Sequence, residues 1–419
     1  MIILSASTVI IASIVVFLSV ILLLVIILIV AKSKLTPSGE VTIKINDDEK
    51  ELIVNPGSSL LSTLGSNKIL LPSACGGGGT CAMCRIQVEE GGGSILPTET
   101  GYFTRREQQD NWRLACQVKV KNDLKVKIPQ EIMGIKKWEC EVVSNKNVAT
   151  FIKEFVVKLP EGESLNFRSG GYIQIDVPKI DVDFSKDIDV EEEYRPDWDK
   201  FGIWNLKMKN PEPTYRAYSM ANHPAEGNIV MLNIRIATPP WDREKNTWMN
   251  VNPGICSSYI FSRKPGDKVM ISGPYGEFFI QDTDREMMFI GGGAGMAPMR
   301  SHIFDQFLTK KTKRKATFWY GARSKREVFY EEHFRKIEQE FPNFRFEIGL
   351  SEPLPEDNWK GYTGFIHQII YNEYLVKHDE PEEIEYYLCG PPVMNDAVQK
   401  MLYDLGVPDE NIMFDDFGS

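Results

Sequence analysis

Four cysteines in and after a glycine-rich stretch constrain the fold of this chain more than any other feature. Three of them lie in the run Cys75-Gly-Gly-Gly-Gly-Thr-Cys81-Ala-Met-Cys84, and Cys116 follows farther along. A tight group of this kind indicates metal ligation rather than disulfide crosslinking. Four thiolates can hold a [2Fe–2S] cluster, and glycines let the backbone wrap closely around it with positive φ angles. We therefore expect these four cysteines to be the metal ligands of a module spanning 37–131.

A zinc site is the alternative for the same cysteines. Structural zinc usually takes two separated pairs of ligands, whereas here three ligands share one loop, which favours the iron–sulfur cluster. The spacing is similar to that of plant-type ferredoxins, C-x4-C-x2-C with a distant fourth cysteine, but the first interval is one residue longer. We expect an α+β ferredoxin-like (β-grasp) domain whose first strands are 41–45 and 51–54.

The first thirty residues are almost entirely apolar. Within 9–31 only Ser13 and Ser19 are not apolar, and no charged residue precedes Lys32. Such a run is long enough to cross the hydrocarbon layer as a helix. A signal peptide would carry basic residues before a shorter apolar core, whereas here the lysines follow the run. We predict a transmembrane anchor at 1–31, with the rest of the chain in the cytoplasm by the positive-inside rule.

The charge of the chain excludes one class of partner. The formal net charge is −10, which argues against nucleic acid, because phosphate binding needs a basic face. The remaining cysteines, Cys140, Cys256 and Cys389, are scattered, and the bulk of the chain is expected in a reducing compartment.

A β-rich region follows at 132–282, with strand patterns at 155–159 and 170–177. It contains Arg216-Ala-Tyr218-Ser219, which alone could be a chance run within a strand. The segment resembles the RxYS motif of the ferredoxin reductase-like family, in which the Arg meets the flavin pyrophosphate, the Tyr packs on the flavin ring and the Ser lies near its N5.

Two later segments extend that resemblance. Gly254-Ile-Cys-Ser257-Ser258 is similar to the family's second phosphate-binding loop, and Gly273-Pro-Tyr-Gly276 is similar to its GPxG turn. The resemblance implies an antiparallel β-barrel that binds FAD through Arg216, Tyr218, Ser219, Gly254, Ser257 and Ser258, with Tyr218 and Ser219 also acting in catalysis.

The region 283–419 has the pattern of a nucleotide-binding sheet. An apolar strand at 287–290 runs into Gly291-Gly292-Gly293-Ala-Gly295, and a helical stretch extends to 309. This order places a dinucleotide phosphate at a helix N-terminus. Strand patterns at 316–320, 345–348 and 385–388 alternate with helical stretches at 328–341 and 392–405, which predicts an α/β domain with a parallel sheet.

Resemblance to the same family also suggests which residues lie near the nicotinamide ring. Cys389-Gly390-Pro-Pro is similar to the family's CGPP signature, where the Cys lies near the reacting carbon of the nicotinamide. The alternative is a buried cysteine acting as a small hydrophobe. In the family a C-terminal aromatic covers the flavin, and Phe417 is the candidate here, with a frayed tail as the alternative.

Two segments leave open alternatives. The stretch 181–193 is rich in Asp and Glu, and it is either a solvated loop or a docking surface for a partner. The cations of Arg323-Ser-Lys-Arg326 could hold the 2′-phosphate of NADPH or lie in a solvated turn; the wider resemblance points to NADH.

Taken together, the order of modules and the runs CGGGGTCAMC, RAYSMAN and LCGPPVM resemble the F subunits of the bacterial Na+-translocating NADH:quinone oxidoreductases. The resemblance implies an inner-membrane component that takes hydride from NADH onto FAD and passes single electrons to a [2Fe–2S] cluster. Integral membrane partners would then reduce ubiquinone and move Na+. A membrane-tethered reductase of an oxygenase and an electron carrier with a vestigial flavin module are the alternatives.

Overall fold

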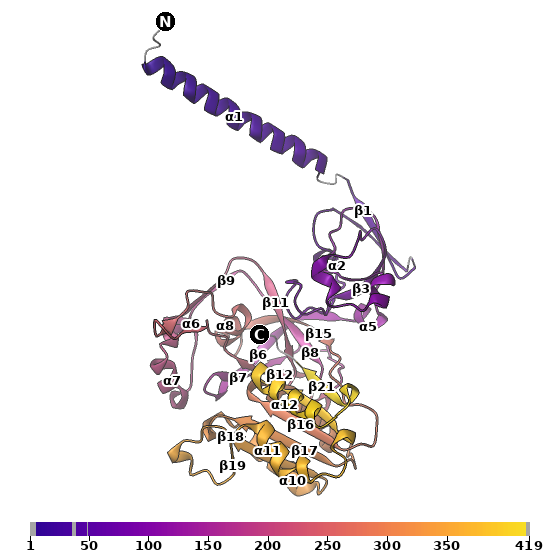
Figure 1. Cartoon of the computed structure of the whole chain (residues 1–419), viewed down its shortest axis with the longest axis vertical. Coiled ribbons are helices and arrows are strands. Elements are labelled where there is room, and N and C mark those ends of the chain that lie inside the picture. Colours follow the sequence, from indigo (N-terminus) through magenta and orange to yellow (C-terminus); the bar gives the residue numbers. More distant parts are fainter. Residues whose placement is uncertain (1–5, 36–38, 48, 416–419) are drawn as a thin grey trace. The chain divides into compact units, whose positions relative to one another are not determined.

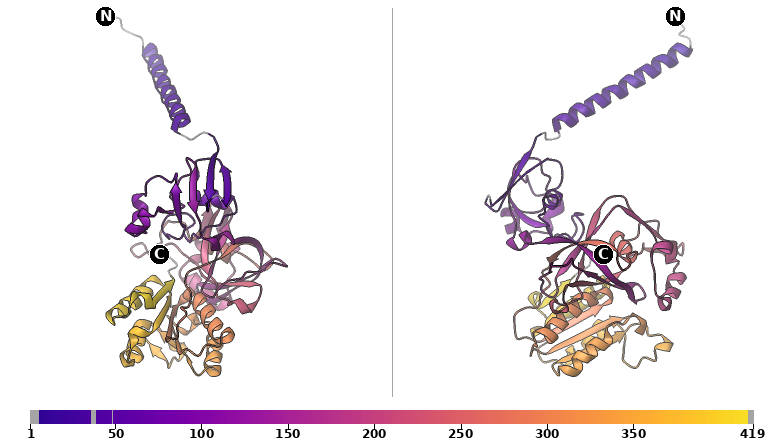
Figure 2. Two further views of the ribbon diagram at one scale, coloured as in Figure 1. Left: turned by 90° about the vertical axis from the view of Figure 1, so that its right-hand side faces the viewer. Right: turned by 180° about the vertical axis from the view of Figure 1, so that it is seen from behind.

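The computed structural model describes residues 6–35, 39–47 and 49–415, and in the first helix the side chains of 12–28 (Figures 1 and 2). The chain forms two compact units. The first comprises Met1–Pro72 and Gly77–Gly134, and the second comprises Ser73–Gly76 and Ile135–Ser419. Each unit is described by itself below.

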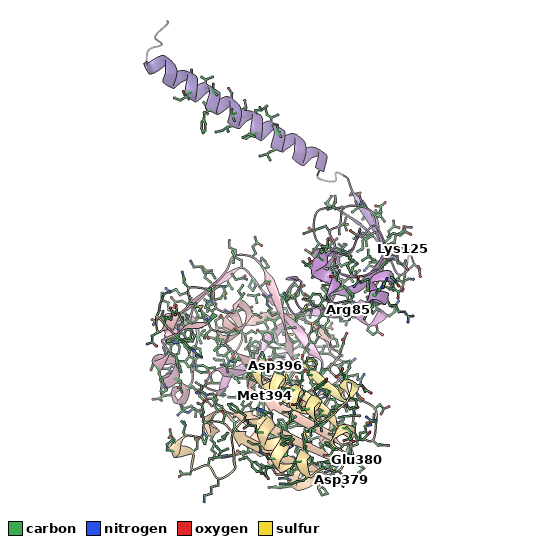
Figure 3. All side chains as sticks on the ribbon, viewed as in Figure 1. Arg85, Lys125, Asp379, Glu380, Met394 and Asp396 are labelled. Carbon is green, nitrogen blue, oxygen red and sulfur yellow. The ribbon has the colours of Figure 1, made fainter. Side chains whose placement is uncertain are left out.

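Helix α1 (Ala6–Leu35) contains the apolar run expected from the sequence. Its large described side chains, from Ile14 to Leu28, are all exposed apolar groups, drawn as sticks in Figure 3. The hydroxyl of Ser19 donates to the carbonyl oxygen of Val15 at 2.8 Å, so this polar group is satisfied inside the helix. Within the described residues, no helix combines the length and apolarity needed to cross a membrane.

The rest of the first unit is built on a five-stranded sheet of order β2-β1-β5-β3-β4. Strand β1 pairs antiparallel with β2 and parallel with β5, so a local hairpin meets a strand from much later in the chain. Helix α2 begins after Ser59, whose hydroxyl accepts from the Ser62 amide, and packs Leu60 and Leu64 on the sheet. This is the expected α+β fold. Its elements are β1 (Val41–Ile45), β2 (Lys50–Val54), α2 (Leu60–Ser66), β3 (Arg85–Glu90), α3 (Pro97–Thr100), α4 (Arg105–Gln109), β4 (Trp112–Leu114), β5 (Leu124–Lys127) and α5 (Gln130–Met133).

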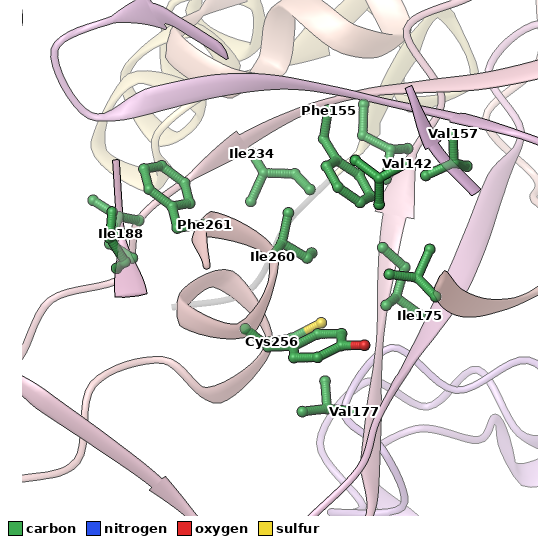
Figure 4. Packing of buried hydrophobic residues seen from close by; sticks show 14 of the residues in the cluster. Val142, Phe155, Val157, Ile175, Val177, Ile188, Ile234, Cys256, Ile260 and Phe261 are labelled. Atoms are coloured by element: carbon green, nitrogen blue, oxygen red, sulfur yellow. The ribbon is translucent and has the colours of Figure 1, made fainter. Parts of the chain in front are cut away.

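The second unit begins with a six-stranded antiparallel sheet of order β11-β8-β15-β6-β7-β12. A bridge between Met220, just after β11, and Leu232 in β12 joins the first strand to the last and closes the sheet into the expected barrel. Its interior is apolar and includes Cys256 (Figure 4). The elements are β6 (Lys136–Ala149), β7 (Ile152–Lys158), β8 (Tyr172–Val177), β11 (Thr214–Ser219), β12 (Ile229–Arg235), α8 (Ile255–Phe261) and β15 (Lys268–Tyr275).

An insertion between β8 and β11 contains the acidic stretch 181–193. Of the two alternatives for this stretch, a wholly solvated loop does not hold, because the stretch buries Phe184, Ile188 and Val190 between its carboxylates; the docking surface stays a prediction. Trp198 lies farther along the insertion and is fully buried. Its indole N–H donates to the Thr150 carbonyl oxygen at 2.8 Å. The main elements are β9 (Ile180–Asp183), α6 (Phe184–Asp187), α7 (Arg195–Lys200) and β10 (Lys207–Asn210), with β9 and β10 antiparallel.

The last part of the chain forms a six-stranded parallel sheet of order β19-β18-β17-β16-β20-β21. The sheet has an apolar cluster on each side: one contains Met299 of α9 and Phe334 of α10, and the other contains Ile370 of α11 and Leu402 of α12. This confirms the predicted α/β fold. The elements are β16 (Met287–Gly292), α9 (Met296–Phe304), β17 (Ala316–Ala322), α10 (Glu331–Glu340), β18 (Phe344–Leu350), β19 (Tyr362–Thr363), α11 (Ile366–Glu373), β20 (Glu385–Cys389), α12 (Pro392–Asp404) and β21 (Ile412–Asp415).

Candidate functional site

The parallel sheet reverses its strand order at β16, whose neighbours are β17 and β20. In open parallel sheets ligands bind at such a switch point, outside the carboxyl ends of the strands. The glycine-rich loop follows β16, and the Cys389-Gly390 loop follows β20, so the two predicted dinucleotide loops are neighbours.

The glycines of these loops have different roles. A Cβ on Gly295 would overlap the carbonyl oxygen of Cys389, and a Cβ on Gly292 would lie 2.8 Å from the sulfur of Met394, which is labelled in Figure 3. A Cβ on Gly390 would lie 2.3 Å from the terminal methyl carbon of the same methionine. Gly295 is therefore needed for the two loops to pack, because its neighbour is backbone, whereas at Gly292 and Gly390 the flexible end of Met394 could move. Gly293 differs, because its φ is +56° and a Cβ there would meet only Ile152, 3.8 Å away, which leaves room for a ligand.

The loop leads directly into α9, as the sequence predicts. All nine residues of α9, from Met296 to Phe304, are buried. The backbone N–H groups of a helix's first turn have no partner inside the helix and attract an anion. The turn formed by Gly293–Gly295 opens this helix and can hold a phosphate.

The Arg216-Ala-Tyr218-Ser219 segment is strand β11, paired antiparallel with β8. Arg216 is half-buried, and one of its guanidinium nitrogens, Nη1, donates to the Tyr215 carbonyl oxygen at 2.7 Å. The side chain of Tyr218 forms a hydrogen bond with that of Cys256 on α8. Loss of surrounding water, with a further contribution from Cys256, raises the pKa of Tyr218 well above its usual value. The ring is therefore a neutral, oriented aromatic surface.

Ser219 has a partner that the sequence did not suggest. Its hydroxyl donates to Asp415 Oδ2 at 2.6 Å, linking β11 of the barrel to β21 of the parallel sheet. Asp415 begins the run Asp-Asp-Phe near the end of the chain, in which only Phe417 was a candidate from the sequence. Phe417 itself lies outside the described residues.

The second phosphate loop opens α8, as expected. Gly254 precedes the helix, and a Cβ there would lie 2.6 Å from that of Ala237. The hydroxyls of Ser257 and Ser258 both donate to the Gly254 carbonyl oxygen, at 3.2 and 2.7 Å. Because these hydroxyl protons are already used, the first-turn N–H groups are the donors best placed for a phosphate.

Cys389 lies at the end of β20 and is fully buried, packed in the same cluster as Phe289 and Tyr387. The structure thus places its side chain among apolar groups and its carbonyl oxygen against Gly295. Its proximity to a nicotinamide stays a prediction.

Of the four predicted metal ligands, Cys81, Cys84 and Cys116 belong to the first unit. Cys75 lies in Ser73–Gly76, which groups with the second unit. No disulfide joins any of the seven cysteines, all of which lie within the described residues. The amide of Ala115 donates to the Cys84 carbonyl oxygen at 2.8 Å, which brings the strand before Cys116 onto the loop. A hydrogen bond with Cys116, together with burial and the nearby Cys81, raises the pKa of the Cys84 thiol. A bound cationic cluster would stabilise these sulfurs as thiolates.

The loop backbone also suits a cluster. Gly76, Gly77, Gly79 and Ala82 all have positive φ, so the chain curls tightly between the cysteines. The side-chain amide of Gln117 lies 3.7 Å from Cys116 Sγ, a donor that sequence reasoning missed. In the part of the chain that the structure describes, no three His, Cys, Asp or Glu side chains are grouped to hold a metal ion.

A buried polar joint connects the barrel to the parallel sheet and was also missed from the sequence. Arg300 on α9 donates to both carboxylate oxygens of Glu226, at 2.6 and 2.8 Å, and to the Ala221 carbonyl oxygen. His223 contacts the same carboxylate at 3.0 Å. Ala221 is the second residue after the strand that carries Ser219, so the joint ties the end of β11 to helix α9.

Three protein families match successive parts of the chain. Residues 43–121 match the 2Fe-2S iron-sulfur cluster binding domain, residues 203–280 the oxidoreductase FAD-binding domain, and residues 289–400 the oxidoreductase NAD-binding domain. The cofactors implied by the cysteine loop, the β11 motif and the glycine loop are thus the cofactors of these families.

Solved structures share this fold. The chain is similar to the Amycolatopsis cytochrome P450 reductase GcoB, with 21% identity and a TM-score of 0.60 over 90% of this chain and 98% of that one. It is also similar to the ferredoxin reductase of carbazole 1,9a-dioxygenase, with 25% identity and a TM-score of 0.58 over 91% and 99%. These likenesses support the fold.

Curated relatives are much closer in sequence. A protein of Methylococcus capsulatus is 60% identical over 93% of this chain and 94% of its own length, and one of Neisseria gonorrhoeae is 58% identical over the same shares. Both are named as the F subunit of a Na(+)-translocating NADH-quinone reductase. With its NAD-, FAD- and 2Fe-2S-binding domains, the chain is an NADH-oxidising, electron-transferring protein. It belongs to the family of the F subunits of Na+-translocating NADH-quinone reductases.

Proposed function

We propose that this chain is the electron-input subunit of a membrane respiratory complex, taking hydride from NADH at the carboxyl end of the parallel sheet. The observation that carries the proposal is the meeting of three elements in the second unit. The glycine loop and the Cys389 loop pack on each other at the switch point, and β21 of the same sheet reaches Ser219 of the barrel through Asp415.

The chain's own residues would bind and orient the reactants. Arg216 and the N-terminus of α8 would hold the FAD pyrophosphate, and Tyr218 would face the ring. The glycine loop and α9 would hold the NADH pyrophosphate, and Ser219, oriented by Asp415, would lie beside the reacting atoms. A bound flavin accepts hydride and releases electrons singly, which the cluster requires.

The cluster would be held by Cys75, Cys81, Cys84 and Cys116. All four lie within 43–121, the residues that match the 2Fe-2S family. Cluster potentials depend on hydrogen bonds to the ligand sulfurs, and the Gln117 amide is such a donor. The domain limits proposed are 37–131 for this module, 132–282 for the FAD barrel and 283–419 for the NADH sheet.

Helix α1 would anchor the chain in the bacterial inner membrane, with residues 37–419 in the cytoplasm. Support comes from the uncharged run 9–31, from the exposed apolar side chains of 14–28 and from the internally bonded hydroxyl of Ser19. In lipid every polar group must be satisfied within the protein. The described side chains of α1 cover only part of this run.

Partner subunits in the same membrane would complete the reaction. The relatives are named as one subunit of a Na+-translocating quinone reductase. The run 9–31 has no ionisable residue, whereas intramembrane ion paths are built from such residues. Ubiquinone reduction and Na+ movement would therefore belong to integral membrane partners.

The test is to record visible and low-temperature EPR spectra of the anaerobic full chain on addition of NADH. The expected result is bleaching of the flavin band followed by a rhombic reduced [2Fe–2S] signal. Flavin bleaching without that signal would contradict the cluster assignment. Co-purification of the wild-type chain with integral membrane proteins, and its loss when 1–31 is deleted, tests the anchor separately.

A further inference from the structure

The cations after β17 bear on the choice between NADH and NADPH. In dinucleotide-binding sheets the strand next to the glycine-loop strand ends near the adenosine ribose, where an acidic residue binds the 2′-hydroxyl or an arginine accommodates the 2′-phosphate. Here that strand is β17, and the residue that follows it is Arg323. By position alone Arg323 would suit NADPH.

The structure shows a carboxylate already bound to this arginine. Arg323 Nη2 donates to Glu352 Oε2 at 2.7 Å. Glu352 comes from the neighbouring strand end, two residues after β18 (Phe344–Leu350), and its own amide donates to the Arg323 carbonyl oxygen at 2.7 Å. The parallel pairing of Ala322 with Leu350 continues into this contact. The backbone therefore holds the two residues opposite each other.

The second arginine of the loop is also paired. Arg326 donates to Asp197 of the barrel insertion at 3.0 Å. The Lys325 amide donates to Asp357, whose pKa is lowered by amide hydrogen bonds and by the nearby cations. Both arginines of this loop thus already have a carboxylate partner.

We propose that Glu352 selects NADH over NADPH by occupying Arg323, the cation that would otherwise bind the 2′-phosphate. The carboxylate neutralises the arginine, repels the extra phosphate and leaves an acceptor for the ribose hydroxyl of NADH. The contact is solvent-exposed, with side chains 71% and 65% exposed, so a phosphate could reach Arg323 once the carboxylate is gone. The inference rests on the proposed placement of NADH at this sheet.

The experiment uses the full-length, detergent-solubilised holoprotein at low salt and compares the wild type with Glu352→Gln. Steady-state rates with NADH and NADPH and a one-electron dye give KM, and calorimetry gives direct binding of 2′,5′-ADP and 5′-ADP. Freeing the guanidinium for a charge-assisted bond to phosphate is expected to lower the KM for NADPH and the Kd for 2′,5′-ADP about tenfold or more. The KM for NADH should change by less than about threefold, because the hydroxyl contact is weak when exposed.

Two control variants isolate the mechanism. Glu356→Gln removes the same charge from the same loop, where the side chain is exposed, and should not improve NADPH use. Glu352→Gln combined with Arg323→Gln should lose the whole gain. Unchanged NADPH and 2′,5′-ADP affinities in Glu352→Gln would overturn the role of Glu352. Placement of NADH is tested apart from this: if Gly295→Ala left the KM for NADH unchanged, the site itself would be wrong.

Discussion

Because Gly295 has no side chain, the glycine-rich loop can pack directly against the Cys389 loop. Its backbone lies so close to the Cys389 carbonyl that a Cβ would overlap it. We expect Gly295→Ala to raise the KM for NADH severalfold and to lower the unfolding free energy by about 1–3 kcal/mol, as overpacking does. Steady-state kinetics and urea unfolding measure the two effects.

Gly293→Ala is the matched control, since it has open space but a φ of +56°. Conformational strain alone should lower its stability by about 1–2 kcal/mol. If Gly295→Ala were as stable as the wild type, packing between the loops would not be the reason for Gly295.

Gln117 is a second residue to test, through its expected contribution to the reduction potential of the cluster. Its amide lies 3.7 Å from Cys116 Sγ, and its carbonyl oxygen accepts from the Thr98 hydroxyl at 3.4 Å, which orients the amide. An N–H donor stabilises the more negative, reduced cluster. Gln117→Met should therefore lower the midpoint potential by about 30 mV, the equivalent of one weak hydrogen bond.

An EPR-monitored redox titration measures that potential. Gln108→Met, which removes an amide that donates to the Phe103 carbonyl oxygen, should leave the potential unchanged. A Gln117→Met potential within a few millivolts of wild type would contradict the assignment.

At the scale of elements, the joint between the barrel and the parallel sheet is expected to weaken at low pH. Burial alone would raise the pKa of Glu226, but hydrogen bonds from Arg300 and His223 outweigh it and lower the pKa from 4.5 to about 2. A carboxylate with a depressed folded-state pKa contributes stability above its unfolded pKa and loses it as the pH falls. The contribution, about 3 kcal/mol, should be present above pH 5 and fade between about pH 4.5 and 2.

Urea unfolding of the wild type and Glu226→Gln between pH 3 and 7 tests this. The difference in unfolding free energy should shrink steadily below pH 4.5. A difference that did not vary with pH would mean that ionisation of Glu226 does not stabilise the joint.

The stability of the insertion after β8 is expected to depend on one tryptophan. Trp198 is fully buried, bonds to the Thr150 carbonyl oxygen and stacks near Phe261, with ring centroids 6.1 Å apart. Trp198→Ala should lower the unfolding free energy by about 3–5 kcal/mol, as for other buried aromatic truncations. Trp204→Ala, at a half-buried position, should cost clearly less; equal losses would contradict the central role of Trp198.

Elements with a strong local pattern were predictable from sequence. The run from β16 through the glycine loop to α9 has apolar residues followed by glycines, and the structure has the same order. The insertion was missed because Phe184, Ile188 and Val190 alternate with carboxylates that dominate its composition. The bond between Ser219 and Asp415 and the pair of Arg300 with Glu226 were missed for another reason: they join distant residues, and no local pattern records tertiary contacts.

At the scale of the whole molecule, the division into two units predicts separable chemistry. The unit from Ile135 onward contains every residue proposed to bind FAD and NADH in the described part of the chain. A fragment of 135–419 should bind FAD and bleach its flavin with NADH at a rate within about threefold of the full chain, because each domain carries its own core. Stopped-flow absorbance measures that rate.

The complementary change is Cys75→Ala in the full chain. It should abolish the cluster signal in EPR and leave NADH-driven flavin bleaching intact. Loss of flavin reduction in this variant would show that the two redox centres depend on each other for folding.

The bond between Ser219 and Asp415 also sets an order of events during biosynthesis. The two residues are separated by 196 positions, and domains generally fold as they emerge from the ribosome, N-terminal first. The barrel strand that carries Ser219 is therefore made well before its acceptor. A nascent barrel can acquire its shape early, yet the Ser219 hydroxyl gains this acceptor only after translation has passed β21. The contact that ties the barrel to the parallel sheet at this point is thus among the last that the chain can make.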